Sequence, residues 1–508
     1  MPASGFFYLQ YVMLLSNFLL RPLGIGCIRR YLPLRLFLAA FSPPVLGVSA
    51  AASAFRAGAA TSNITPFLSD GIVGGWTAPP ATHIHDELHV RCLVLDDGTT
   101  RLAFGVVDNV QIPRTVFDAA KELIRETTGL PPSHVMLSAT HTHSSASARG
   151  KSALLFGQPF DEYQQFLVRR IADGVRRAIH NLAPARIGWG TGSVPQHVFN
   201  RRWLLKDGKT TTSPFGHIDL AKMNPGSVYA DLLKPAGPTN PEVYFVTVQT
   251  DEGRPLALLA NYWLHYVGGI APRTFSADYF GVFSERIAEL LGEPGQDPPF
   301  VGMMANGPCG DATNNNYNAY GKPGTKRYAP YEKMRVVAND VALEIMRVYP
   351  TVVHHDTVVL KSAYADVNLR MRRAPPGVDA LADRLLARPA STNNIQQKEA
   401  IFARRAVEAR TWPATTPVPL QVFRIGELGI AAIPFEVFTE TGFEINARSP
   451  FKNTFTIELA NGGYGYLPTP EQHELGGYET WFTINRVERA ASRKIVAKLM
   501  DLFAEVRR

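Results

Sequence analysis

The chain has 508 residues, of which 45% are hydrophobic and 19% are charged, and 52 basic against 44 acidic residues give a formal charge of +8. This composition excludes disordered and collagen-like proteins. Half of the excess charge lies in the first 54 residues, which contain four arginines and no acid. The remainder shows no basic stripe of the kind that binds nucleic acid, so we expect no nucleic-acid partner. Three cysteines are too few for a disulfide scaffold or a cysteine-based zinc ribbon.

The first 54 residues have the pattern of a leader rather than of a folded domain. An arginine pair precedes an apolar stretch, which ends in a run of small residues up to Ala54. This order is typical of a signal peptide, so we expect cleavage near Ala54 and export to the periplasm or the medium. Two alternatives stay open: a twin-arginine signal, and residues 1–28 as an upstream extension or a membrane anchor. Cys27 would leave with the leader, and the pairing of Cys92 with Cys309 depends on the fold.

Beyond the leader, strand and helix patterns alternate without a sequence repeat. In chain order we predict a strand at 101–107, a helix at 114–127, a strand at 134–139, a helix at 161–182, strands at 243–249 and 256–264, a helix at 279–291, a strand at 300–304, helices at 331–348 and 395–409, strands at 428–433 and 454–459, and a helix at 484–506. Asp251-Glu252-Gly253 is a hairpin turn. The proline-containing span 370–419 is predicted to be an insertion or cap. We expect one large α/β domain over 55–508, with a mixed sheet and flanking helices.

Polar side chains follow five of these strands at the point where each strand ends. In chain order they are Thr140-His141-Thr142-His143, His265, Asp311 with Thr313, Glu436, and Tyr464 with Tyr466. In α/β sheets such strand ends converge on the ligand crevice. Two imidazoles, a carboxylate and a phenol at one edge predict a metal site. Zinc accepts this mixture of nitrogen and oxygen ligands, with a position left open for water.

Each of these residues also has an ordinary structural interpretation. His141 and His143 lie on the same side only if their segment is extended, and His265 by itself is typical of a hydrogen-bonded core histidine. Glu436 would be a first-turn carboxylate favoured by the helix dipole. The remaining residues would be packed loop aromatics (Tyr464 and Tyr466), caps of a helix or turn (Asp311 and Thr313), and a solvated loop (Asn200-Arg201-Arg202).

Taken together, these segments resemble the neutral/alkaline, non-lysosomal ceramidase family, from about Ile64 to Ile484. That family consists of zinc amidases that cleave ceramide into sphingosine and a fatty acid. The matching motifs, in chain order, are Thr140-His141-Thr142-His143-Ser144, the Asn200-Arg201 loop, His265 with Ser276-Ala277-Asp278-Tyr279-Phe280-Gly281, Pro434-Phe435-Glu436 with Thr439 and Gly442, and the tyrosines Tyr466 and Tyr478, which keep the twelve-residue spacing of the family. The tyrosine spacing and the Thr-His-Thr-His run are the specific parts.

The resemblance implies a set of roles for these residues. It makes His141, His265, Glu436 and Tyr466 the zinc ligands, and it places His143, Arg201 and Tyr478 around the reacting centre. The residues alone leave Tyr464 and Tyr466 as alternatives. Thr313 stands where the family has a serine sometimes considered a nucleophile, which favours a metal-bound water as the attacking group. The loop after His143 also departs from the family pattern, and no counterpart of the immunoglobulin-like carboxy-terminal domain is expected.

The expected activity is therefore hydrolysis of an N-acyl amide at a zinc ion that activates water. Tyr478 and His143 would stabilise the oxyanion, and His143 would protonate the leaving amine. Asp311 and Thr313 would position water or substrate, and Arg201 would orient a polar headgroup. The partner would be a small-molecule or lipid N-acyl substrate, with contact to a membrane surface allowed and the oligomeric state open. Two alternatives remain: a zinc hydrolase of the same fold that acts on another acyl amide or ester, and a catalytically silent lipid- or glycan-binding protein.

Overall fold

The computed structural model describes residues 55–149, 159–319, 322, 325–389 and 393–508. The predictions on the leader, its cleavage near Ala54 and Cys27 lie outside these residues. Within them, no helix is long and apolar enough to cross a membrane.

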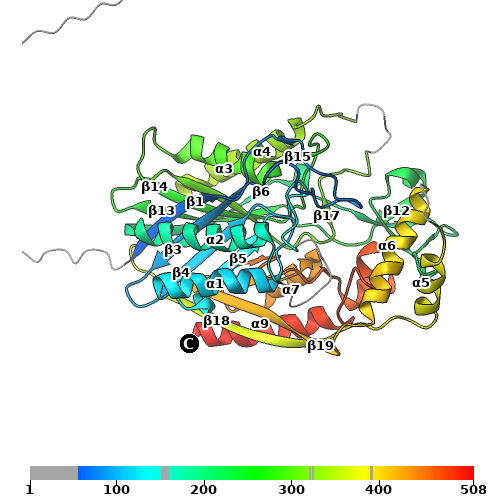
Figure 1. Ribbon diagram of the computed structural model, residues 1–508. Helices are drawn as coiled ribbons and strands as arrows, with labels where there is room; N and C mark the ends of the chain where they lie inside the picture. Colours follow the sequence, from blue (N-terminus) through cyan, green and yellow to red (C-terminus); the bar gives the residue numbers. More distant parts are fainter. Residues whose placement is uncertain (1–54, 150–158, 320–321, 323–324, 390–392) are drawn as a thin grey trace, which may run out of the picture. The chain divides into compact units, whose positions relative to one another are not determined.

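Three successive segments of the chain share one topology, which we call the first, second and third repeats (Figure 1). The first contains β1 (Arg56–Asn63), β3 (His89–Asp96), β4 (Arg101–Val107), α1 (Arg114–Thr128), β5 (Val135–Ala139) and α2 (Glu162–His180). The second contains β6 (Ala183–Ser193), β13 (Glu242–Thr250), β14 (Pro255–Tyr262), α3 (Asp278–Leu291), β16 (Val301–Asn306) and α4 (Glu332–Val348). The third contains β18 (Leu360–Arg370), β19 (Thr415–Ile425), β20 (Leu428–Ala432), α7 (Thr439–Arg448), β22 (Asn453–Ile457) and α9 (Ala491–Arg507).

Each repeat forms four strands in the same order and with the same directions. The first three strands pair antiparallel, whereas the fourth pairs parallel with the third across a helical crossover. β1 and β6 pair at only two positions, which join the first two sheets into one of eight strands. The sequence shows no repeat because the topology is conserved while the side chains and loop lengths differ.

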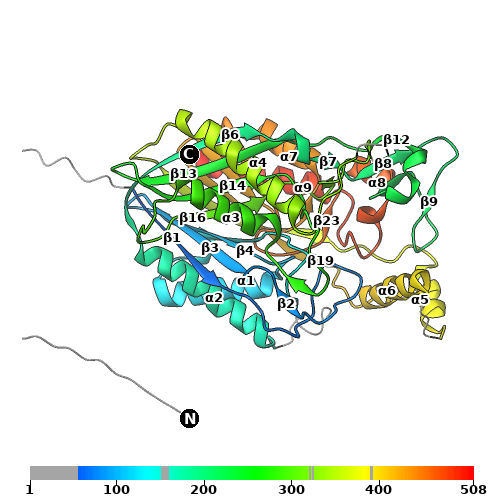
Figure 2. The same cartoon turned by 90° about the horizontal axis from the view of Figure 1, so that it is seen from above.

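Alternating side chains of these strands build the core. Phe104, Leu259 and Phe423, one from each repeat, belong to a single apolar cluster between the sheets. Their neighbours point the other way and pack against helices, α1 and α2 in the first repeat, α3 and α4 in the second, and α7 and α9 in the third. The period of two along each strand thus gives every sheet one face on the shared core and one face under helices (Figure 2).

The predicted fold class, a mixed sheet with flanking helices, is confirmed, as is the hairpin turn at 251–253. The predicted strands and helices agree with the observed ones except at their ends. The largest difference is the last helix, predicted from 484 but beginning at Ala491. Asn485 and Val487 instead form β-bridges to Gly465 and Met371, so tertiary pairing overrides the local helical pattern.

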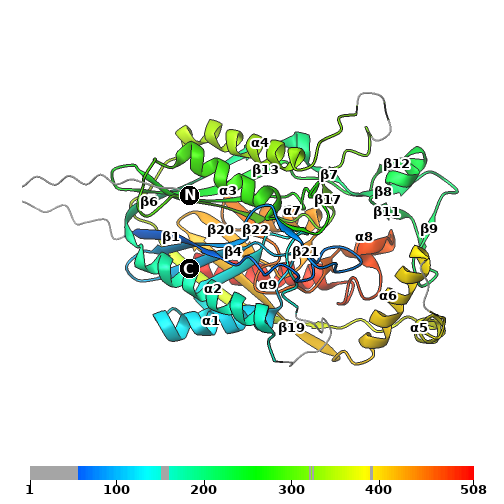
Figure 3. The same cartoon turned by 45° about the horizontal axis from the view of Figure 1, so that its top comes forward.

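Every repeat carries an insertion between its first and second strands. The insertions span residues 64–88, 194–241 and 371–414, and the third contains α5 (Val378–Leu386) and α6 (Asn394–Ala409). The predicted cap at 370–419 corresponds to the third, but its last residues are strand β19. The insertions meet through aromatic rings: Trp76 lies 5.9 Å from Phe402, and Phe215 lies 6.2 Å from Phe402. The elements of the second and third insertions accordingly gather at one end of the described residues (Figure 3).

Candidate metal centre

The carboxyl ends of the parallel strands bring three histidines together. His141 follows β5 and His265 follows β14, and their Nε2 atoms lie 3.0 Å apart. The Nε2 atom of His143 lies 3.2 Å from that of His141. The ligand nitrogens of a tetrahedral zinc ion, each about 2.1 Å from the metal, would be separated by roughly 3.4 Å. The three buried or half-buried imidazoles therefore can hold a metal ion.

Hydrogen bonds of the Nδ1 atoms of His141 and His265 determine that their Nε2 atoms face the centre. His141 Nδ1 lies 2.6 Å from the carbonyl oxygen of Val110, and His265 Nδ1 lies 3.1 Å from that of Cys309. A carbonyl only accepts, so both Nδ1 atoms donate, and the two Nε2 atoms face one another. Nε2 atoms 3.0 Å apart that present lone pairs to one point would be bridged by a cation. This arrangement, with carbonyls fixing the tautomer, is the one found behind metal-ligating histidines.

Glu436 and Tyr466 complete the centre from the third repeat. They face each other on the short parallel strands β21 (Glu436–Val437) and β23 (Tyr466–Leu467). Glu436 Oε2 lies 3.4 Å from His141 Nε2 and 3.8 Å from His265 Nε2, and this buried oxygen has no hydrogen-bond partner among the described residues. Burial raises the pKa of Glu436, but His141, Arg201 and Tyr466 outweigh it and hold that pKa below its usual value. An ionised, orphaned oxygen beside two imidazole lone pairs fits a divalent cation.

Of the two tyrosines that the residues left open, the structure brings only Tyr466 to the centre. The Tyr464 hydroxyl donates to the carbonyl of Pro417, 3.0 Å away, and its ring packs on Phe435. In an extended segment, side chains two positions apart, such as Tyr464 and Tyr466, would point the same way. A turn at Gly465 (φ +91°) reorients the chain between them, so the two rings lie in different places. Tyr466, and not Tyr464, is therefore the tyrosine that pairs with Glu436.

Hydrogen bonds between repeats close a ring around the centre. Asn306 Nδ2 donates to the Thr140 carbonyl (2.9 Å), which links the second repeat to the first. The Glu458 amide donates to the Asn306 carbonyl (3.0 Å), and the Ala139 amide donates to the Leu459 carbonyl (3.2 Å). The candidate ligands thus come from all three repeats, and the contacts that join the repeats lie directly behind them.

Arg201 approaches the centre from the second insertion. Its Nη1 lies 3.2 Å from His265 Nε2, and its guanidinium lies over the Tyr466 ring at 5.0 Å. Nε donates to the fully buried Glu479 (3.0 Å), which also binds Arg202. Nη2 is buried and has no partner among the described residues, so one donor is left for a ligand.

Asp311 and Thr313 form hydrogen bonds with neighbouring segments of the second and third repeats. Both oxygens of Asp311 are occupied: Oδ1 accepts from the amide and hydroxyl of Thr439, and Oδ2 accepts from Asn200. Thr313 pairs with the strand before Arg201, and its hydroxyl accepts from the Asn315 amide. That both residues position water or substrate stays a prediction; their bonds link the segments of Arg201 and of the start of α7.

Known structures share this architecture. No model of a known protein family matches the sequence. The structure of neutral ceramidase from Pseudomonas aeruginosa is similar over 89% of this chain and 74% of that chain, with a TM-score of 0.65 and 18% identity. A ceramidase complexed with C2 gives 0.66 and 17% over 89% and 75%. The chain has the neutral ceramidase fold. The fold expected from the sequence motifs is therefore confirmed.

Tyr478 lies beside Tyr466 in this ceramidase fold. Its ring lies 5.9 Å from Tyr466, 6.3 Å from Trp76 and 5.6 Å from Trp481. No hydrogen bond from its hydroxyl to any described residue is present, in contrast to Tyr464. A half-buried phenol that is held by ring packing alone keeps its O–H available for a bound molecule.

His143 is held by two residues that the sequence did not single out. Its ring stacks on Tyr266 at 3.7 Å, and a loop of the first insertion crosses it at Gly74. Burial lowers the pKa of His143 well below its ordinary value, and His141 and Arg201 lower it further. The His143 imidazole is therefore neutral at neutral pH. Tyr266 and Glu479, the partners of His143 and Arg201, could have been found from the sequence. Tyr266 directly follows His265, and Glu479 directly follows Tyr478.

Gly74 provides a direct test of how tightly His143 is positioned. An added Cβ would lie 2.6 Å from the Cβ and Cγ atoms of His143, and Gly74 has a φ of +110°. We expect Gly74→Ala to displace the His143 ring and reduce kcat/KM roughly tenfold to a hundredfold, with zinc still bound. The adjacent Gly75→Ala is the control, because its Cβ would meet nothing closer than 3.5 Å. Equal activity of the two variants would contradict this placement.

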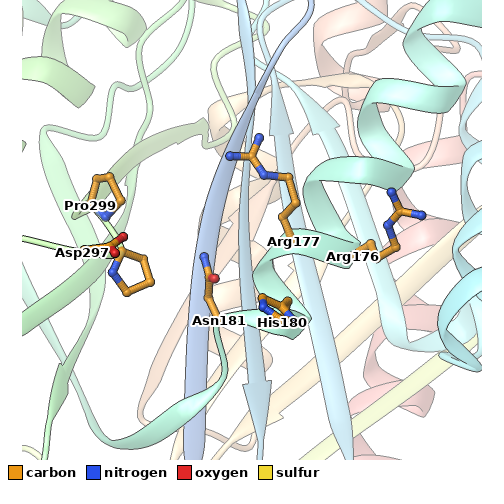
Figure 4. A pocket seen from close by; sticks show the side chains of 7 residues that line it. Arg176, Arg177, His180, Asn181, Asp297 and Pro299 are labelled. Carbon is orange, nitrogen blue, oxygen red and sulfur yellow. The ribbon is translucent and has the colours of Figure 1, made fainter.

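A cavity lies at the other end of the strands from the histidines. It measures about 430 Å³ and is lined by Arg177 and Asn181 at the end of α2 and by Asp297–Pro299 before β16 (Figure 4). These segments lie at the amino ends of the parallel strands, and none of the candidate ligands lines the cavity. Cys92 and Cys309 are both buried free thiols in different core clusters, so they do not pair.

Proposed function

We propose that this protein is a zinc-dependent amidohydrolase that cleaves an N-acyl amide, with ceramide as the leading substrate class. The observation that carries the proposal is the pair of imidazole Nε2 atoms 3.0 Å apart beside a buried oxygen of Glu436 that has no hydrogen-bond partner among the described residues. A cation would give that oxygen the partner that a buried polar atom needs. His141, His265, Glu436 and Tyr466 would hold the ion.

A zinc ion bound there would supply Lewis acidity, which acidifies water and polarises the amide carbonyl. The protein contributes the surrounding groups. His143, beside the centre and neutral, accepts a proton as water attacks and returns it to the departing nitrogen. Tyr478 and the unpaired Nη2 of Arg201 donate to the oxygen on which negative charge develops. Glu479 positions Arg201 by fixing its Nε.

Aromatic rings beside Tyr478 support an acyl substrate. The exposed Trp76 and the half-buried Trp481 pack against Tyr478, and the buried Phe402 contacts both of them. An acyl chain would bury its methylenes there at roughly 0.8 kcal/mol each. One of the similar structures is a ceramidase complexed with C2, which agrees with a lipid amide. Other acyl amides and esters would fit the same chemistry.

Metal removal tests the proposal. Dialysis against a chelator should abolish hydrolysis and lower the melting temperature by several degrees, and stoichiometric Zn²⁺ should restore both. Zinc present at a thousand times its Kd contributes about 4.1 kcal/mol to folding. Elemental analysis measures the metal content, calorimetry measures the melting temperature, and an amide assay measures hydrolysis. Unchanged activity and stability after complete removal of metal would contradict the proposal.

The substrate panel separates the alternatives. Ceramides, short N-acyl amides and acyl esters should be offered to the zinc-loaded protein, with release of the fatty acid as the measurement. Turnover of ceramide supports the proposed class, whereas faster turnover of short amides or esters supports another substrate for the same centre. Bound zinc without turnover of any of them would support a silent binding protein.

A further inference from the structure

The side chain of Glu458 is a buried carboxyl that the proposed reaction does not use. Glu458 follows β22 of the third repeat and is fully buried. Its Oε2 atom accepts from the Val437 amide at 2.7 Å and from the Cys309 amide at 3.2 Å. Its Oε1 atom lies 2.9 Å from the Sγ atom of Cys309. The carboxyl thus binds one segment of the second repeat and one segment of the third.

The segment of the second repeat lies directly behind His265. The Cys309 carbonyl accepts from His265 Nδ1 at 3.1 Å, and this bond turns the Nε2 atom of His265 toward the centre. The same carbonyl also accepts from the Ala312 amide at 2.9 Å. Because Glu458 binds the Cys309 amide, it fixes the residue whose carbonyl orients His265.

The segment of the third repeat contains Glu436. Val437, which directly follows Glu436, donates its amide to Glu458, and its carbonyl accepts from the Gly310 amide at 2.8 Å. A Cβ atom at Gly310 would lie 2.5 Å from the Glu436 carbonyl oxygen, which shows how closely the two segments approach each other. They therefore form one unit, and the Glu458 carboxyl binds both of its halves.

The contacts of Glu458 depend on its length more than on its charge. Burial raises the pKa of Glu458 to about 8, although the hydrogen bonds from Cys309 and Val437 oppose this rise. A neutral carboxyl still accepts both amide bonds through one oxygen, and the carbonyl oxygen of a glutamine would do the same. Aspartate is one methylene shorter, so its carboxylate would not reach both amides.

We propose that Glu458 is a positioning residue of the metal centre, whose carboxyl holds the carbonyl behind His265 and the strand of Glu436 in place. This inference rests on the metal site of the proposed function and adds a residue behind its ligands. One side chain would thereby link a ligand of the second repeat to a ligand of the third. Loss of a group that orients metal ligands typically lowers metal affinity or activity about tenfold to a hundredfold.

Two conservative variants separate reach from charge. Glu458→Gln keeps the length and loses the charge, whereas Glu458→Asp keeps the carboxylate and loses the reach. We expect the Kd for zinc, measured by competition with a chelator, to rise about tenfold to a hundredfold in Glu458→Asp and to stay within about threefold in Glu458→Gln. An unchanged Kd in Glu458→Asp would overturn the proposal. A tenfold rise in Glu458→Gln would overturn it too, because glutamine keeps both amide bonds.

Thr456→Val, two positions earlier in the chain, is the matched control. The Thr456 hydroxyl is buried and has no partner among the described residues, so its removal breaks no hydrogen bond. We expect its zinc Kd to equal that of the unaltered protein. The melting temperatures of the metal-free proteins identify a purely structural role. If Glu458→Asp melts earlier but its folded form binds zinc with an unchanged Kd, the positioning role is refuted.

Cobalt provides a spectroscopic test that needs no substrate. The visible absorption of bound Co²⁺ reports the number and arrangement of its ligands. We expect Glu458→Gln to give the spectrum of the unaltered protein, and Glu458→Asp to give a shifted or weaker one. The same spectrum in all three proteins would contradict the proposed role.

These measurements separate the inference from the function on which it rests. If Glu458→Asp weakens zinc binding but no amide is hydrolysed by the unaltered protein, the proposed reaction fails and the positioning role stands. If amides are hydrolysed and the zinc Kd of Glu458→Asp is unchanged, the reaction stands and the role of Glu458 is refuted.

Discussion

Replacement of His141 by alanine should yield a folded protein that holds no zinc and hydrolyses no amide. The Nε2 atom of His141 is the central atom of the candidate centre, 3.0 Å from His265, 3.2 Å from His143 and 3.4 Å from Glu436. Its loss removes the contact that all the other groups share. We expect kcat/KM to fall at least about a thousandfold, which corresponds to roughly 4 kcal/mol of transition-state stabilisation. Zinc content by elemental analysis and fatty-acid release measure the two effects.

His134, at the other end of strand β5 from His141, offers a matched control. It precedes β5, whereas His141 follows it, and its Nδ1 lies 3.0 Å from the Arg101 carbonyl. His134→Ala removes an imidazole at the opposite edge of the sheet and should leave zinc content and turnover near those of the unaltered protein. Full zinc occupancy with full turnover in His141→Ala would remove His141 from the centre.

The strand ends explain why so much of the centre could be predicted from the sequence. A buried strand has a strong apolar pattern, so the sequence shows where the strand ends. A polar residue directly after that point lies at the edge of the sheet. This is why His141, His265 and Glu436 could be grouped before their distances were known. Tyr466 could not be distinguished from Tyr464 in this way, since the choice depends on the turn at Gly465 and on the β-bridge between Gly465 and Asn485.

Other features depend on contacts that no local pattern records. β1 and β6 are rich in alanine and glycine, which have little preference for strands, so their places in the sheet are fixed by their neighbours. Glu479 acquires its role from Arg201, 278 positions away in the chain. The repeated topology is likewise invisible in the sequence, because the shared feature is the order and direction of strands.

The repeats also explain how the protein separates stability from specificity. The ring of hydrogen bonds through Thr140, Asn306 and Glu458 fixes the ligands to the shared core. The insertions, by contrast, supply Trp76, which packs on Tyr478, and Arg201, which lies beside His265. A change in an insertion can therefore alter what is bound without moving the metal ligands.

Tyr478→Phe should lose turnover while it keeps the metal. The hydroxyl makes no hydrogen bond to a described residue, and ring contacts with Tyr466, Trp76 and Trp481 hold the side chain in place. Removing one oxygen should therefore leave the ring where it is and delete only the donor to the developing oxyanion. Loss of one such donor lowers kcat by roughly a hundredfold to a thousandfold. Steady-state kinetics should show this in kcat, with zinc content unchanged.

Tyr464→Phe is the matched control for that experiment. It also removes a phenol oxygen from the segment after β22, but the Tyr464 hydroxyl donates to the Pro417 carbonyl, away from the histidines. We expect it to lose about 1 kcal/mol of stability and to keep its turnover. Similar kcat values for the two variants would show that Tyr478 takes no part in the reaction, because both changes remove the same group and only one lies at the centre.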